Sequence, residues 1–246
     1  MGAGGARVHG TLMSNVLLVA GAGDGLGRSI AMRFAREGYA VALVARNAQK
    51  LEALAEETGG QAFPADLTSE SEVMSVFQNV ESLGPISAVA FVAATRTQAP
   101  IAETSLEDFE RTWRQSCLSG FLVGREAARR MLPRRRGTIL FTGASGSLRG
   151  RAGFAAYAAA KGGLRFLAQS MARELGPEGI HVATVLIDGA IDNPMMWREY
   201  RSRMEKLGTD GAVHPDAAAE TYWQLHCQPR NAWTHEVDLR PWSQPF

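Results

Sequence analysis

Short apolar runs alternate with amphipathic stretches along most of the chain, from residue 15 to about residue 190. Apolar runs of this length are typical of parallel strands buried on both faces, and the amphipathic stretches between them are typical of crossover helices. A seventh run, with alternating apolar positions, follows near the C-terminus. The predicted strands cover residues 15–20, 40–45, 61–66, 86–93, 137–143, 181–188 and 234–240.

The stretches between these runs carry signals for the start and the end of helices. Leu26, Ile30 and Phe34 recur every four residues and line one helical face, and Gly38 stops this helix. Polar residues suited to cap the next three helices are Asn47, Ser69 in a capping box with Glu72, and Ser105, which opens a long fourth helix. The pattern predicts an α/β protein with a doubly wound parallel sheet of about seven strands in a single domain.

Charged residues are close to balance, with 26 Lys and Arg against 25 Asp and Glu. No strong field therefore draws the protein to nucleic acid or to an anionic membrane, and a small molecule is the expected partner. The two cysteines, Cys117 and Cys227, form no CxxC pair, and the five scattered histidines offer no metal-ligand spacing. We expect a reduced, cytoplasmic protein without a metal.

The two ends of the chain differ in composition from its middle. Residues 1–13 lack the apolar core of a signal peptide, and no apolar run reaches the roughly 20 residues that span a bilayer. We predict a disordered extension over residues 1–13 and one domain over residues 14–246. Residues 194–229 are rich in methionine and aromatic side chains, which either pack into the core or form a mobile lid over an apolar substrate.

Four glycines follow the first predicted strand in the stretch AGAGDGLG, residues 20–27. A glycine-rich turn at the start of a helix lets backbone N–H groups approach a pyrophosphate, and the helix dipole favours its negative charge. This predicts a dinucleotide site. After the second strand, Arg46 stands where an acidic residue would accept the ribose hydroxyls, which favours NADP. NAD is the alternative, because Asp24 adds negative charge near the same ribose.

Tyr157 and Lys161 stand four residues apart in the stretch YAAAK, after the fifth predicted strand. On a helix this spacing places them on one face, where an ammonium favours the ionised phenol and lowers its pKa from about 10. The tyrosine can then exchange a proton near neutral pH. We predict that the pair performs acid/base catalysis.

With the glycine turn and this pair at their places in the βα order, the chain resembles the short-chain dehydrogenase/reductase family from about residue 14 to residue 240. The resemblance implies a Rossmann fold that transfers hydride between a nicotinamide cofactor and an alcohol or carbonyl substrate, usually as a homodimer or homotetramer. The residues that it places at the cofactor are Gly21, Gly25, Leu26, Gly27, Asp66, Leu67, Ala93, Tyr157, Lys161, Gly189 and Ile191.

The resemblance is incomplete around the reacting groups. Ala144 replaces the serine that the family carries thirteen residues before the tyrosine, and Ser116 replaces its helical asparagine. Ser145 is our candidate for the missing hydroxyl, although strand alternation turns adjacent side chains to opposite faces. Thr142, Thr95 or a group on the substrate are the other candidates. Loss of one such donor typically costs on the order of 10²–10³ in rate, which leaves catalysis possible.

Two further departures lie at strand ends. The family's Asn-Ala-Gly after the fourth strand reads Val92-Ala93-Ala94, and its Pro-Gly after the sixth strand reads Asp188-Gly189. A carboxylate at position 188 can bind a polar or cationic substrate near the nicotinamide. An exposed turn residue is the more frequent role for an aspartate at a strand end, and we expect that role.

Two functional hypotheses follow. The first is an NAD(P)-dependent oxidoreductase with Tyr157 as acid/base and Lys161 as its electrostatic and ribose-binding partner. The second is a non-catalytic dinucleotide-binding sensor or scaffold, favoured by the loss of serine and asparagine together. A cofactor-free relative is disfavoured, because the glycine turn and Asp66 are intact. Small side chains in the fourth helix, at Ser119, Gly120, Gly124 and Ala127, permit close helix packing and support a homo-oligomer.

Overall fold

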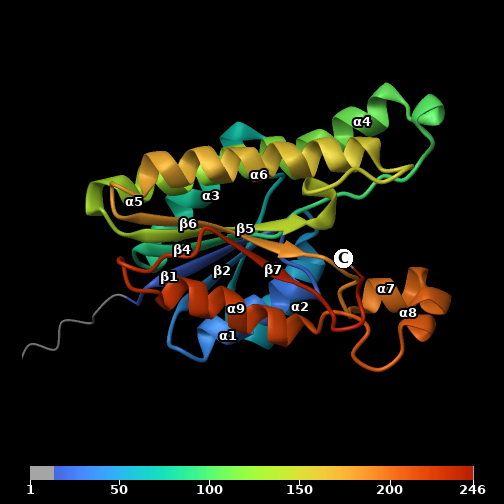
Figure 1. Ribbon diagram of the computed structural model, residues 1–246. Helices are drawn as coiled ribbons and strands as arrows, with labels where there is room; N and C mark the ends of the chain where they lie inside the picture. Colours follow the sequence, from blue (N-terminus) through green and yellow to red (C-terminus); the bar gives the residue numbers. More distant parts are fainter. Residues whose placement is uncertain (1–13, 246) are drawn as a thin grey trace, which may run out of the picture.

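The computed structural model describes residues 14–245, and a seven-stranded sheet runs through its centre (Figure 1). Its strand order is β3-β2-β1-β4-β5-β6-β7, and every neighbouring pair is parallel, which confirms the doubly wound sheet. The predicted extension over residues 1–13 lies outside the described residues. The strands are β1 (Val16–Ala20), β2 (Ala40–Ala45), β3 (Gln61–Pro64), β4 (Ile86–Phe91), β5 (Gly137–Ala144), β6 (Ile180–Ile187) and β7 (Glu236–Leu239).

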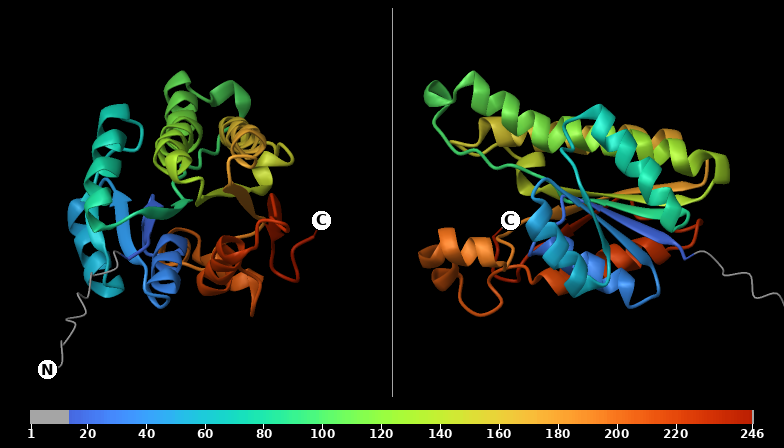
Figure 2. Two further views of the ribbon diagram at one scale, coloured as in Figure 1. Left: turned by 90° about the vertical axis from the view of Figure 1, so that its left-hand side faces the viewer. Right: turned by 180° about the vertical axis from the view of Figure 1, so that it is seen from behind.

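Helices cover both faces of the sheet, as the two views of Figure 2 also show. Helices α3, α5 and α6 lie on one face, and α1, α2 and α9 on the other, while α4, α7 and α8 lie at the end to which the strands point. None of the described helices has both the length and the apolar composition needed to cross a bilayer. The helices are α1 (Leu26–Ala35), α2 (Ala48–Thr58), α3 (Glu70–Val80), α4 (Leu106–Trp113), α5 (Ser119–Met131), α6 (Ala155–Leu175), α7 (Pro194–Glu199), α8 (Arg201–Leu207) and α9 (Pro215–Cys227).

The central strand β1 shows why the apolar runs are continuous. Val16 and Leu18 belong to the core under α3, α5 and α6, whereas Leu17 and Val19 belong to the core under α1, α2 and α9. All four side chains are fully buried. Because successive strand residues point to opposite faces, a strand covered on both sides needs an apolar residue at every position.

Side-chain caps fix the helix starts largely as predicted. The side chains of Asn47, Ser69 and Ser105 each accept a backbone N–H from the first turn of α2, α3 and α4. The predicted capping box is formed only in part, because the Glu72 carboxylate accepts the N–H of Asp66, at 2.8 Å. This contact ties the start of α3 to the end of β3.

The long fourth helix is interrupted, contrary to the sequence prediction. A π-helical turn over Arg114–Leu118 separates α4 from α5. Ser116, at the family's asparagine position, is buried in this turn, and its Oγ accepts the N–H of Thr95 at 3.1 Å. The interruption thus fastens the helix to the segment that follows β4.

The methionine- and aromatic-rich stretch 194–229 divides into two parts. Helix α9 packs on α1, and its Tyr222 is fully buried, which agrees with core packing. Helices α7 and α8 instead project beside the end of the sheet, held together by a small cluster that includes Met196 and Met204. Only this second part is placed where a lid would lie.

Candidate functional site

The glycine turn lies at the carboxyl end of β1, where the chain order of the sheet reverses and where ligands of such sheets bind. Gly21 has a φ of +93°, and a Cβ there would lie 2.6 Å from the Cβ of Ala93. At Gly27 a Cβ would lie 3.1 Å from the Cα of Ala22. Gly25 precedes α1 and offers no side-chain cap. The N–H of Arg28 donates to the oxygen of Gly23, which leaves the N–H groups of Leu26 and Gly27 at the start of the helix for an anion.

Two adjoining cavities run from this turn along the edge of the sheet, with volumes of about 550 Å³ and about 360 Å³. They bring together all the residues predicted to hold the cofactor. The larger cavity is lined by Gly21, Gly25, Leu26, Gly27, Tyr157, Lys161, Gly189 and Ile191, among others. The smaller one is lined by Gly21, Arg46, Asp66, Leu67 and Ala93, among others.

Asp66 is held in place by its neighbours at the mouth of the smaller cavity. Its Oδ1 accepts both the backbone N–H and the hydroxyl of Thr68, each at 2.9 Å. Arg46 lines the same cavity and is exposed, and Asp24 lines the larger one. Arg46, which favours NADP, and Asp24, which favours NAD, thus both line the site.

Tyr157 and Lys161 both line the larger cavity from α6. Lys161 is 2% exposed, and its Nζ donates a hydrogen bond to the backbone oxygen of Thr142 at 2.8 Å. Burial lowers the pKa of Lys161 to about 8, although the electrostatic interaction with Cys117 raises it in part. Figure 1 shows α6 running across β5 and β6, which brings its first turns over the strand ends.

The expected lowering of the tyrosine pKa is not what the structure shows. Burial raises the pKa of the Tyr157 phenol, and the charge of Arg96 opposes this rise. Desolvation disfavours the phenolate, and it outweighs the attraction of nearby cations. Arg96 lies in the segment after β4, and no local pattern there predicts a charge that acts on the tyrosine.

The residues near the missing serine point in different directions. Ala144, the last residue of β5, lines the larger cavity, whereas Ser145 does not. Thr142 directs its hydroxyl to Tyr222 at 2.7 Å, inside the protein. Thr95 forms a hydrogen bond with Gln115, and both line the smaller cavity. The hydroxyls of Thr142 and Thr95 are thus engaged by other side chains, and Ser145 does not line the larger cavity.

Asp188 is not the exposed turn residue that we expected. It is 2% exposed, and its Oδ2 accepts hydrogen bonds from Arg149 at 2.8 Å and Arg240 at 2.9 Å. The two guanidinium groups neutralise the carboxylate, which also removes it as a site for a cationic substrate. The partners lie 39 and 52 residues away in the sequence, so no local pattern predicts them.

Sequence reasoning missed several residues that line the larger cavity. Lys50 lies in the first turn of α2, and Asn193, Met195 and Arg198 belong to α7 and its N-cap. One signal was available, because Asn193 before Pro194 is a typical N-cap pair, and its side chain does accept the N–H of Met196. Among the described residues, no group of His, Cys, Asp or Glu side chains is placed to hold a metal ion.

Comparison with known proteins gives matches over most of the chain. Residues 15–204 match the family model described as short chain dehydrogenase. The 3-oxoacyl acyl-carrier-protein reductase of Rattus norvegicus is 34% identical over 176 residues, which cover 70% of this chain and 74% of that protein. Sorbitol-6-phosphate 2-dehydrogenase of Escherichia coli is 29% identical over 219 residues, with 85% and 83% covered.

A solved structure adds to these matches. The crystal structure of a short-chain dehydrogenase from Rhodopseudomonas palustris is similar with a TM-score of 0.79 at 40% identity, and the match covers 93% of this chain and 99% of that one. Because the match covers 93% of the chain, it extends beyond residue 204, where the match to the family model ends.

Proposed function

The chain belongs to the short-chain dehydrogenase family of oxidoreductases, and on that premise we propose that it transfers hydride between NADP and an alcohol or carbonyl substrate. The observation that carries this proposal is the convergence of the glycine turn, Asp66, Tyr157 and Lys161 on two adjoining cavities. These residues come from three separate segments of the chain, because Tyr157 and Lys161 share α6. Their meeting at one edge of the sheet is what a dinucleotide site requires.

The residues present fit a nicotinamide dinucleotide. A Cβ at Gly21 would collide with the backbone of Ala93, and one at Gly27 would lie in tight contact with that of Ala22, so the turn packs closely here without side chains. This turn and the start of α1 would hold the pyrophosphate, and Asp66 and Leu67 would lie at the adenine. When bound, the cofactor supplies or accepts the hydride.

Arg46 supports NADP over NAD as the cofactor. A guanidinium favours a 2′-phosphate by charge and by paired hydrogen bonds. Lys50 lines the neighbouring cavity and adds a second positive charge. Asp24 opposes them with one negative charge against two positive charges, and all three side chains are exposed, so water and salt weaken each of them.

Tyr157 is the group that we assign to proton transfer. In the direction of reduction, its phenol would donate a proton to the substrate oxygen, which suits a pKa raised by burial. Lys161 is fixed on the backbone of β5 beside it, where its ammonium would contact the cofactor ribose and stabilise the phenolate left after transfer. Ala144 offers no second donor. The neighbouring Ser145 could donate this second hydrogen bond only if the turn Ser145–Ser147 shifted toward the cavity.

One observation favours the alternative of a non-catalytic dinucleotide-binding protein. Two hydroxyls near the position of the missing groups have other partners, with Thr142 bound to Tyr222 and Ser116 bound to the backbone of residue 95. Such a protein would bind the cofactor and leave carbonyl compounds unchanged. In this alternative Lys161 can still bind the ribose, but the phenol of Tyr157 has no proton to transfer, and we therefore rank the alternative second.

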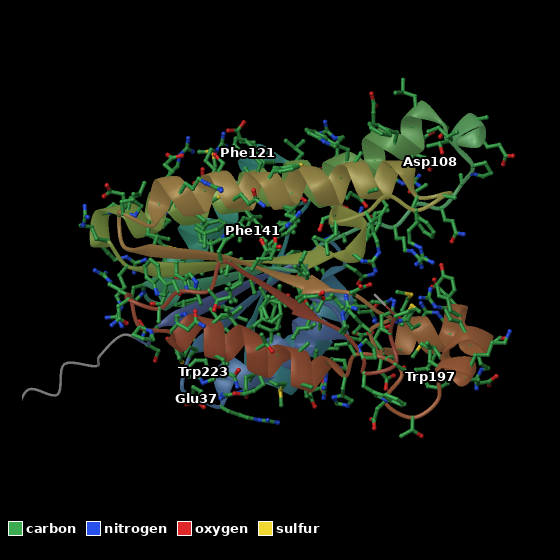
Figure 3. The ribbon with its side chains drawn as sticks, in the orientation of Figure 1. Glu37, Asp108, Phe121, Phe141, Trp197 and Trp223 are labelled. Carbon is green, nitrogen blue, oxygen red and sulfur yellow. The ribbon has the colours of Figure 1, made fainter. Side chains whose placement is uncertain are left out.

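We also propose that the protein forms a homodimer or homotetramer through the helices on the α5 side of the sheet. Large apolar side chains are exposed there, and Figure 3 shows Phe121 on the outer surface of this layer. Burial of such side chains against a second copy removes them from water. The exposed residues are Phe109, Trp113, Phe121 and Phe166.

The test is cofactor consumption with a panel of carbonyl compounds and alcohols, followed at 340 nm, for wild type and Tyr157→Phe. We expect NADPH-dependent reduction of at least one compound, and a fall of about 10²–10⁴ in turnover on removal of the hydroxyl. Fluorescence titration should show that both proteins bind NADPH equally well. Binding without any Tyr157-dependent turnover would refute the enzyme proposal and support the binding protein.

A further inference from the structure

A third cavity, of about 900 Å³, opens beyond the tyrosine between the segment after β4, the loop before α6 and the junction of α7 with α8. Figure 3 shows Asp108 of α4 and Trp197 of α7 on the two sides of this end of the molecule. The cavity wall carries Arg96 and Arg151, together with the ring of Tyr200. No acidic side chain is part of its wall among the residues that the structure describes.

Arg203 of α8 does not line the cavity, but its backbone N–H donates to the oxygen of the cavity-lining Tyr200 at 2.9 Å, which brings a third, exposed guanidinium near it. Its pKa is lowered, first by partial burial and then by the repulsion of Arg96 and Arg151. The charges of the three arginines therefore act on one another. Like charges that are held together destabilise a protein unless an opposite charge joins them.

Several other arginines near this end of the molecule have such a partner. Arg149 and Arg240 share the carboxylate of Asp188, and Arg198 pairs with Glu199. On α8 itself, Arg201 pairs with Glu205, at 3.9 Å. Within residues 14–245, by contrast, Arg96, Arg151 and Arg203 form no ion pair. The fold thus neutralises its neighbouring cations and leaves these three for another anion.

Arg96 connects this cluster with the reacting tyrosine. Its guanidinium lies over the ring of Phe154 at 4.6 Å and over that of Tyr200 at 5.9 Å, which orients it between the loop before α6 and the start of α8. From there its charge acts on the Tyr157 phenol. A molecule with its carbonyl at the phenol can therefore reach the arginines with another part of the same molecule.

We propose that Arg96, Arg151 and Arg203 form an anion subsite and that the substrate is an acidic carbonyl or alcohol compound, bearing a carboxylate or a phosphate. The inference rests on the proposed function for the identity of the reacting group, whereas the anion subsite itself rests only on the arginines. Guanidinium groups bind both kinds of anion through paired hydrogen bonds, so both share this recognition.

The first experiment compares substrates that differ only in charge, with NADPH as reductant. The pairs are acetoacetate with its ethyl ester, and dihydroxyacetone phosphate with dihydroxyacetone. We expect kcat/KM for at least one anion to exceed that of its neutral partner by about 10-fold or more. The pair that shows the preference distinguishes a carboxylate site from a phosphate site.

Variants then locate the preference. Arg151→Ala should lower the ratio of kcat/KM for the anion to that for its neutral partner by about 10-fold, and Arg151→Lys should restore part of it. The matched control is Arg173→Ala, which removes an exposed arginine near the far end of α6 that hydrogen-bonds the backbone of residue 169. It should leave the ratio as in wild type. A ratio near one in wild type, or equal loss in both alanine variants, overturns the anion subsite.

A binding measurement separates failure of the subsite from failure of the proposed function. Inorganic phosphate and acetate are titrated calorimetrically into the NADP-bound protein, with wild type, Arg151→Ala and Arg173→Ala. Binding of either ion that weakens about 10-fold only in Arg151→Ala supports the subsite, even if no carbonyl compound is reduced. Reduction of neutral compounds without Arg151-dependent binding of either ion refutes the subsite and leaves the oxidoreductase standing.

Discussion

Two regions of the site are held in place by different means. We call the first the glycine half and the second the tyrosine half. The glycine half comprises residues 21–27, 46 and 65–68, and the tyrosine half comprises residues 142–147, 157–161 and 187–191. In the glycine half, the glycines let the turn pack closely, and the left-handed Gly21 lets it pass against Ala93.

The tyrosine half depends on side chains that arrive from distant parts of the chain. Tyr222 of α9 holds the hydroxyl of Thr142, while Arg240 beyond β7 holds Asp188. Lys161 is buried with only a backbone oxygen as its hydrogen-bond partner. The turn of the glycine half is thus specified by a short motif, whereas the tyrosine half is specified by contacts across the whole domain.

The largest effect is expected from Ala144→Ser, which would make the tyrosine half more like that of the family. If the half lacks only one hydrogen-bond donor, a hydroxyl on this cavity-lining residue should raise kcat toward a generic diketone by up to ~10²–10³. The gain should disappear in the double variant with Tyr157→Phe, because the phenol would still be needed to move the proton.

Ser145→Ala distinguishes between the two explanations for the missing donor. If a shift of the turn lets Ser145 act, its removal should be the damaging change, and Ala144→Ser should then add little. If neither variant changes kcat, the tyrosine half needs no serine hydroxyl for its chemistry, and the predicted effect at 144 is wrong.

The fold and the position of the glycine turn could be predicted from the sequence, because both depend on local patterns. Continuous apolar runs marked the strands, and the glycines marked the turn. The partners of Asp188 and the interruption after Trp113 arise from contacts between segments far apart in the sequence, for which periodicity carries no signal. The predicted lowering of the Tyr157 pKa was wrong for the same reason, because the burial of the phenol depends on the packing of the whole domain.

Gly21→Ala should damage the glycine half through the backbone alone. An alanine at position 21 must adopt a left-handed backbone conformation, which costs about 1–2 kcal/mol. Its Cβ would in addition lie too close to Ala93. We expect NADPH affinity to fall about 100-fold in a fluorescence titration. Gly162→Ala is the control, because a Cβ on that α6 residue meets nothing within 4 Å and should raise thermal stability slightly. Equal NADPH affinity in both variants would show that the turn tolerates a side chain.

Lys161 should make stability depend on pH in the tyrosine half. Its pKa is about 8 in the folded protein and near 10.5 when exposed, so the unfolded chain binds more protons between these values. The free energy of unfolding should therefore rise with pH across that interval, by on the order of 2 kcal/mol. Below pH 8 the cost of burying the ammonium is present in full.

Lys161→Met removes this titration while keeping the length of the side chain. Urea unfolding at pH 7.5, 9 and 10.5 should give a smaller pH-dependent rise for the variant than for wild type. The difference between the two proteins isolates Lys161, because the other tyrosine and cysteine groups titrate in both. Identical profiles would show that the lysine is no more difficult to protonate in the fold than in water.

The smallest effect is expected from Arg46→Ala, which tests whether side chains matter at all in the glycine half. An exposed guanidinium contributes modestly to binding a 2′-phosphate, so the ratio of NADPH to NADH affinity should fall only about 3- to 10-fold. Asp24→Asn should shift the ratio in the opposite direction, since it removes a negative charge at the same cavity. Arg36→Ala, at the distant end of α1, controls for a general loss of positive charge.

Both cofactors are titrated by fluorescence at 50 and 300 mM salt, and screening should shrink the Arg46 effect at the higher salt. Tighter NADH binding by wild type would mean that Asp24 outweighs Arg46, and the glycine half would then select NAD.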